Sequence, residues 1–213
     1  MPKNIFLILC TVIVFLISSC SGVITECAPV DYLNWIDNPE NNLIVETKAQ
    51  VYTFSLQYRP VSYLALLEAG SADITSEIID SLEHSLAGQQ QFLFHVALND
   101  GNNDWLNSST NRFNDYEEQI KYLSFSMQND FKLVRHNDTL DCAIFHFERD
   151  YGIRPFGTFL LGFPCDEVQN VSGDTVNFIY SIKVIYTDSS FGDEIIEFPF
   201  SYSDLNKIPT LKL

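Results

Sequence analysis

Apolar and polar residues alternate along several stretches of the chain, which is the pattern of a half-buried β-strand. The alternation is clearest over residues 176–186 and is also regular over residues 50–58 and 92–98. Shorter runs of the same kind predict further strands at residues 120–127, 131–135, 140–148, 158–163 and 195–202. Pro199 in the last run lacks a backbone donor, which indicates an edge strand.

Two stretches near the start of this pattern follow a helical period instead. Residues 61–69 form a short apolar run that ends at Gly70. Residues 74–87 place an aliphatic side chain at every fourth position, at Ile74, Ile78, Leu82 and Leu86. The sequence therefore predicts a mainly β fold, a β-sandwich or a curled antiparallel sheet, with two short helices inserted near its N-terminal side.

The periodic pattern begins only after a different N-terminal part. Residues 20–42 are polar, turn-rich and aperiodic, and we expect a tether whose last residues dock on the domain through Tyr32, Leu33 and Trp35. Residues 43–213 then form a single β-rich domain, because they are enough for one core and contain no repeat or second boundary. The 17 Phe and 10 Tyr exclude a disordered chain.

Residues 1–19 have the features of a secretory signal peptide. Lys3 supplies a positive charge, and residues 5–17 are apolar except for Thr11. As a helix this run would span about 20 Å, which is short of the ~30 Å hydrocarbon core of a bilayer. A basic start, a short apolar run and small residues after it are typical of an export signal that is removed.

The segment Leu16–Cys20, LISSC, resembles the lipobox of bacterial lipoproteins. The resemblance implies that Cys20 is diacylated, becomes the first residue of the mature chain and holds the domain on a membrane of the cell envelope. In the sorting rule of such lipoproteins an Asp after the cysteine favours the inner membrane, so Ser21 favours the outer membrane. An ordinary signal peptide cut after Ser19 is the alternative.

The chain is strongly acidic, with a formal net charge of −16. This charge repels nucleic acids and anionic lipid headgroups, which excludes a nucleic-acid-binding role. Membrane attachment therefore has to come from the lipid, since the chain has no basic surface to supply it.

Three cysteines remain once Cys10 leaves with the signal and Cys20 carries lipid. Cys27 lies in the expected tether, so the favoured disulfide joins Cys142 to Cys165. The alternative is that both are buried free thiols.

A polar loop supplies one candidate ligand site. Asp100, Asn102 and Asp104 have the 1, 3, 5 spacing of a calcium loop, but Trp105 takes the position of the required Gly and Asn111 that of the final Glu. The loop is therefore not an EF-hand, and either a looser calcium site or an Asn/Asp turn remains. Trp105 could contact a sugar or a protein, or anchor the loop to its own domain.

Motifs of known catalytic sites are missing from the sequence. His146 and Glu148 lie on one face of an expected strand, where they could share a metal or a proton, but no further zinc-ligand motif accompanies them. An ordinary sheet face is the alternative, and we expect no cofactor.

Three functions follow from these features. The first is a non-catalytic structural, assembly or protein-interaction module of the envelope, with a partner protein there. The second is a lipoprotein that binds a glycan or a peptide. The third is a hydrolase that uses carboxylates such as Asp193, Glu194 or Glu197. The absence of catalytic motifs and the presence of an anchor favour the first.

Overall fold

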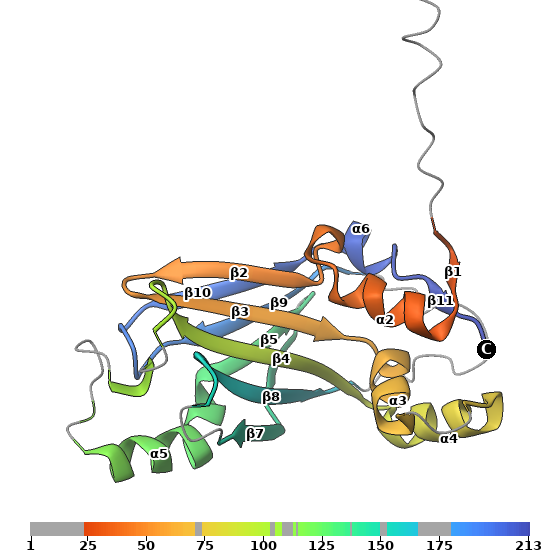
Figure 1. Cartoon of the computed structure of the whole chain (residues 1–213). Coiled ribbons are helices and arrows are strands. Elements are labelled where there is room, and N and C mark those ends of the chain that lie inside the picture. Colours follow the sequence, from red (N-terminus) through yellow and green to blue (C-terminus); the bar gives the residue numbers. More distant parts are fainter. Residues whose placement is uncertain are drawn as a thin grey trace, which may run out of the picture.

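A computed structural model describes residues 24–70, 74–102, 105–107, 113, 115–136, 138–149, 153–165 and 180–213. Cys20, with the signal segment before it, lies outside the described residues, as do Asp104 and Asn111 of the polar loop. Most of the described chain forms strands and short helices (Figure 1).

Two antiparallel sheets and one short parallel pair contain all the strands of the described residues. The five-stranded sheet has the order β2 (Ile44–Ala49), β3 (Tyr52–Arg59), β4 (Gln89–Leu98), β8 (Phe156–Pro164), β7 (Ile144–Glu148). The four-stranded sheet has the order β10 (Ile195–Phe200), β9 (Ile182–Thr187), β5 (Phe131–Arg135), β6 (Asp138–Asp141). The parallel pair is β1 (Glu26–Cys27) with β11 (Thr210–Leu211).

Helices gather at the two ends of the sheets (Figure 1). One end carries α2 (Pro29–Asp37), α3 (Val61–Ala69), α4 (Ser76–Leu86), α6 (Tyr202–Leu205) and the 3₁₀ turn η1 (Pro39–Asn41). Towards the other end lie α5 (Tyr116–Phe125), η2 (Trp105–Asn107) and η3 (Met127–Asp130).

The two large sheets pack face to face over an aromatic core. Phe94 on β4 meets Phe131 on β5 and Phe198 on β10, with ring centroids 5.0 and 5.9 Å apart. Phe54 on β3 meets Tyr186 on β9 at 5.9 Å. These side chains are almost fully buried and come from alternate positions of their strands, so the predicted mainly β, sandwich-like fold is confirmed.

The two sheets are joined differently at their two sides. At one side the chain passes directly from β6 to β7 through Cys142 and Ala143, which makes a covalent corner. At the other side β2 and β10 approach each other without pairing. The side chain of Gln50 closes one end of this second side, because its Nε2 donates to the carbonyl oxygen of Gly192 at 2.9 Å.

Several predicted elements are confirmed, among them both early helices. The strand expected at residues 176–186 is confirmed from Ile182 onward as β9, and residues 176–179 lie outside the described residues. The strand expected at residues 120–127 is wrong: Asp115 caps α5, which buries Gln119 and Leu123 one turn apart and continues into η3. The single strand expected at residues 140–148 is two strands, one in each sheet. The last strand ends at Phe200, where α6 follows.

The expected tether is folded wherever the structure describes it. Pro29 opens α2, which buries Tyr32 and Ile36 at an i, i+4 spacing, and β1 pairs with β11. Among the described residues no helix is long and apolar enough to cross a membrane.

Candidate functional site

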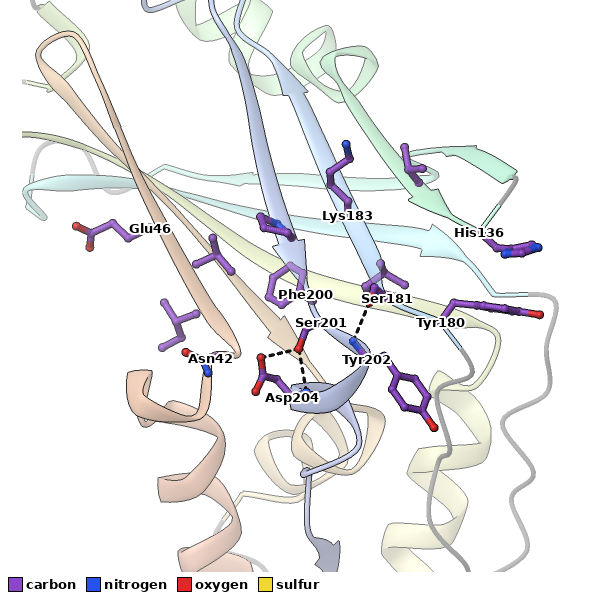
Figure 2. Close-up of a pocket in the computed structure, with 15 residues that line it drawn as sticks. Asn42, Glu46, His136, Tyr180, Ser181, Lys183, Phe200, Ser201, Tyr202 and Asp204 are labelled. Carbon is purple, nitrogen blue, oxygen red and sulfur yellow. Dashed lines mark hydrogen bonds between the residues drawn. The ribbon is translucent and has the colours of Figure 1, made fainter.

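An open pocket of about 1130 Å³ lies where the free edges of β2 and β10 meet the end of the four-stranded sheet. Figure 2 shows Asn42 and Glu46 on one side of this pocket, and His136, Tyr180 and Tyr202 on the other. We call this pocket the edge groove. It is built from segments that are far apart in the sequence, which only the packing of the two sheets brings together.

Aromatic side chains line one side of the edge groove. The rings of His136 and Tyr180 stack, with centroids 4.3 Å apart and planes at 24°. His136 follows β5 with a backbone φ of 51°, a left-handed turn position, and its side chain is exposed. Tyr180 is 39% exposed and Tyr202, the first residue of α6, is 51% exposed. Exposed tyrosines offer apolar area together with a hydroxyl, which suits contact with a partner.

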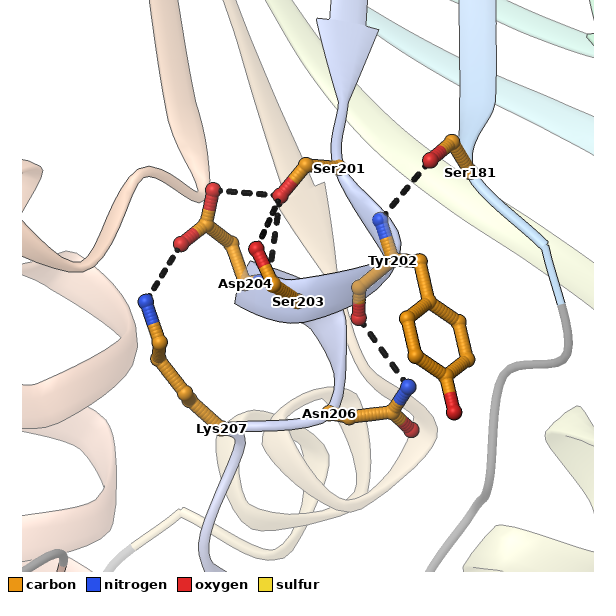
Figure 3. A network of polar contacts seen from close by, with 7 residues as sticks. All are labelled: Ser181, Ser201, Tyr202, Ser203, Asp204, Asn206 and Lys207. Carbon is orange, nitrogen blue, oxygen red and sulfur yellow. Dashed lines mark hydrogen bonds and ion pairs between the residues drawn. The ribbon is translucent and has the colours of Figure 1, made fainter.

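Polar side chains at the base of the edge groove form an internal network around α6 (Figure 3). The hydroxyl of Ser201 accepts from the backbone N–H of Asp204 at 3.1 Å and donates to Asp204 Oδ2 at 2.7 Å. Lys207 Nζ donates to Asp204 Oδ1 at 2.8 Å. The backbone N–H of Tyr202 donates to Ser181 Oγ at 2.9 Å. The hydrogen bonds from Lys207 and Ser201 lower the pKa of Asp204, which keeps it ionised.

Lys183 and Glu46 are two charged side chains that line the edge groove, and of these two only Lys183 has an ion-pair partner among the described residues. Lys183 Nζ lies 2.7 Å from Glu197 Oε1, an exposed cross-strand pair on the outer face of the four-stranded sheet. Glu46 is exposed on the opposite side of the groove, and no described side chain forms an ion pair with it. Glu46 is therefore a groove carboxylate without an ion-pair partner in the part of the chain that the structure describes.

The loop residues singled out in the sequence do not form part of this groove. Trp105 is only 1% exposed and packs edge-on against Phe147 and Phe159, so it anchors its loop to the core and cannot contact a sugar or a partner. Asp100 accepts from the backbone N–H of Asn102 at 3.0 Å, which is an Asx turn. The described part of this loop is therefore an Asn/Asp turn anchored by a tryptophan, and both were alternatives that the sequence left open.

His146 and Glu148 both lie exposed on the outer face of β7, as their spacing predicted. Glu148 Oε2 pairs with Arg154 Nη1 at 3.2 Å. No group of three His, Cys, Asp or Glu side chains among the described residues could hold a metal ion. Glu197 is held by Lys183, while Asp193 and Glu194 lie in the turn before β10, so these carboxylates do not converge on a site.

The structure does not contain the expected disulfide between Cys142 and Cys165. Both thiols are buried. Cys142 donates to the carbonyl oxygen of Ile144 at 3.0 Å, and burial raises the pKa of its thiol to about 11. The Arg135 guanidinium lies 3.9 Å from Cys165 Sγ. The buried thiols are therefore core residues, which was the alternative left open.

His95 lies on the five-stranded sheet and is half-buried, which the sequence did not indicate. His95 lies on the outer face of β4 and packs against Phe156, with ring centroids 4.7 Å apart. Burial, together with the charges of Arg59 and Arg154, lowers its pKa to about 4. His95 is thus a neutral packed side chain at physiological pH.

The edge groove has to be interpreted from its own geometry. No family model matches the chain, and neither a curated protein nor a solved structure matches it.

Proposed function

We propose that this chain is a non-catalytic interaction module of the bacterial cell envelope, which binds a partner protein in the edge groove. The observation that carries the proposal is the meeting of two free strand edges with an exposed aromatic side. Among the described residues, no group of His, Cys, Asp and Glu side chains could hold a metal ion there. Grooves of this kind are typical of sites that recognise extended segments of other proteins.

The anchor is part of the same proposal. The lipobox-like segment Leu16–Cys20 supports acylation of Cys20, and Ser21 favours the outer membrane. Only five residues separate Cys20 from β1, and an extended chain advances at most about 3.5 Å per residue, so the anchor and the folded domain lie within roughly 20 Å of each other. Such an anchor would hold the module close to the bilayer surface, within reach of envelope proteins.

A protein fits the edge groove better than a glycan does. The hydroxyls of Ser181 and Ser201 and the carboxylate of Asp204 already bond within the network around α6. They therefore offer few free groups to read the hydroxyls of a sugar. A glycan is the second candidate, because the stacked rings of His136 and Tyr180 could support a sugar ring.

The overall charge further defines the partner. A net charge of −16 attracts a partner with a positive surface and speeds the encounter at low ionic strength. The association should consequently weaken as salt is raised.

The test is copurification from gently solubilised envelopes with tagged, acylated protein. We expect a partner of fixed stoichiometry with the wild type, and at least a tenfold loss in the double variant Tyr180→Ser/Tyr202→Ser, because the exposed aromatic area is removed. Phe125→Ser is the matched control, since Phe125 is 72% exposed on α5, away from the groove. Cys20→Ala should release the chain from membranes and abolish capture.

Equal recovery of the partner with the tyrosine variant and with Phe125→Ser would contradict the assignment of the groove. If no protein is captured while the folded domain gains thermal stability with envelope glycans, the second candidate replaces the first.

A further inference from the structure

A hydrogen bond in the turn before β10 shows which residues of β10 bond to β9 and which face the free edge. In an antiparallel ladder, alternate residues direct their backbone N–H and C=O groups to one neighbour, and the residues between them direct theirs away. Asp188 N donates to Glu194 O at 2.8 Å, and the same ladder pairs Ile195 with Thr187. The even-numbered residues of β10 therefore bond to β9. The odd-numbered residues, Ile195, Glu197 and Pro199, direct their backbone groups to the free edge.

The same reasoning shows which residues of β2 bond to β3. Tyr58 N donates to Leu43 O at 2.8 Å, in the register that pairs Ile44 with Gln57. The odd-numbered residues of β2 therefore bond to β3, and the even-numbered residues direct their N–H and C=O groups away from the sheet. Two of these, Ile44 and Glu46, line the edge groove.

Pro199 disfavours a ladder between these two edges. It also lines the groove, and its backbone faces the free edge, where it has no N–H to donate. A ladder between β2 and β10 would lack a donor at this position. Among the described residues no strand pairs with the outer edge of β2, so its amides at Ile44 and Glu46 remain available.

We propose that an extended segment of the partner binds in the edge groove as an additional strand on β2, bonded to the backbone of Ile44 and Glu46. This inference rests on the proposed function and names its mode of recognition. Main-chain bonds supply affinity in such strand addition, and pockets for alternate side chains supply specificity. The unpaired carboxylate of Glu46 and the net charge of −16 assign a lysine or arginine to the bound segment.

One pair of variants separates backbone recognition from charge. Glu46→Pro removes the N–H that faces the groove, and it leaves the ladder to β3 intact because that N–H takes no part in it. Glu46→Thr removes the same carboxylate but keeps the N–H. We expect Glu46→Pro to reduce capture of the partner at least tenfold below Glu46→Thr. Matching circular dichroism and melting temperature of the two variants would verify the fold.

Amide hydrogen exchange tests the mode directly on the full domain. The probe is an acetylated and amidated heptapeptide in which valine alternates with lysine or threonine. We expect saturable changes in the amide chemical shifts of Ile44 and Glu46 as the peptide is added. When about nine-tenths of the protein is bound, hydrogen exchange should be slowed about tenfold at these two amides and unchanged at Val45 and Thr47. The same peptide with alternate amides N-methylated should have no effect.

Two outcomes of the peptide experiment would overturn the inference. One is the absence of saturable shifts at Ile44 and Glu46, and the other is equal slowing by the N-methylated peptide. If the partner is captured equally by Glu46→Pro and Glu46→Thr but lost in Tyr180→Ser/Tyr202→Ser, strand addition fails while the edge groove keeps its proposed function. Loss of the tyrosine effect as well would remove both.

Discussion

Trp105 fills the space that Gly157 leaves on the inner face of β8. A Cβ atom built on Gly157 would lie 2.3 Å from Trp105 Cη2, so β8 can carry only glycine at this point. This contact could not be read from the sequence, because the loop around Trp105 is polar and its partner is 52 residues away. A tryptophan in a polar loop indicates either a binding contact or an anchor, and only the packing decides between them.

His95 provides a prediction at the same scale. Its pKa is lowered to about 4, first by burial and then by Arg59, while an unfolded chain keeps a value of about 6.5. Between these values the unfolded state binds more protons, so the contribution of His95 to stability is complete above about pH 6.5 and is lost as the pH falls towards 4. Urea unfolding at pH 7 and pH 4.5 should show a smaller drop for His95→Gln than for the wild type.

His146→Gln is the matched control, because His146 lies exposed on the same face of the sheet. If both variants change the pH dependence equally, or if His95→Gln leaves it as in the wild type, this account of His95 is wrong.

At the scale of elements, the sequence predicted the strands and helices in which apolar residues recur at a regular spacing. The alternation over β3, β4 and β9 corresponds to one buried face in each strand, which is why these strands could be recognised. The spacing of four residues also identified α4, although Ile78 is 40% exposed and Ile79 is the residue that this helix buries. The prediction of a strand over α5 was wrong because a buried Gln119 interrupts the apolar stripe. The corner between β6 and β7 was hidden because Cys142 and Ala143 continue the apolar run.

The short helix α6 carries a prediction of its own. Ser201 caps α6 by accepting from Asp204 N, and it also donates to the carboxylate of Asp204. Ser201→Ala should lower the free energy of unfolding by about 1 kcal/mol, as is usual for the loss of an N-cap hydroxyl. Ser85→Ala on the exposed side of α4, where no cap is lost, should change it by less than about 0.5 kcal/mol. Denaturant unfolding curves of both variants provide the check, and equal midpoints would refute the role of the cap.

At the scale of the whole molecule, the edge groove depends on contacts between distant parts of the chain. Asn42 and Glu46 come from the N-terminal third, His136 from the middle, and Tyr180 and Tyr202 from the C-terminal part. The edge character of the last strand was the one part of the groove that the sequence indicated, through Pro199. The meeting of β2 with β10 could not be predicted, because β2 itself was not recognised as a strand.

The segment expected to be a tether also makes contacts with distant parts of the molecule. Its polar composition hid the i, i+4 pair Tyr32 and Ile36 and the pairing of β1 with β11 near the C-terminus. Because these contacts fix the N-terminal segment to the domain, an anchor at Cys20 would restrict how far and in which directions the edge groove can move. The proposed anchor and the proposed groove therefore belong to one arrangement.

The central claim is that the edge groove is the surface that meets a partner in the envelope. It is tested most directly by site-specific photo-crosslinking in intact cells, with the photoreactive residue at position 180, 202 or 125. We predict one discrete adduct of constant mass at positions 180 and 202 and none at position 125, which lies exposed on α5. No adduct in the groove, or the same adducts at all three positions, would contradict the claim.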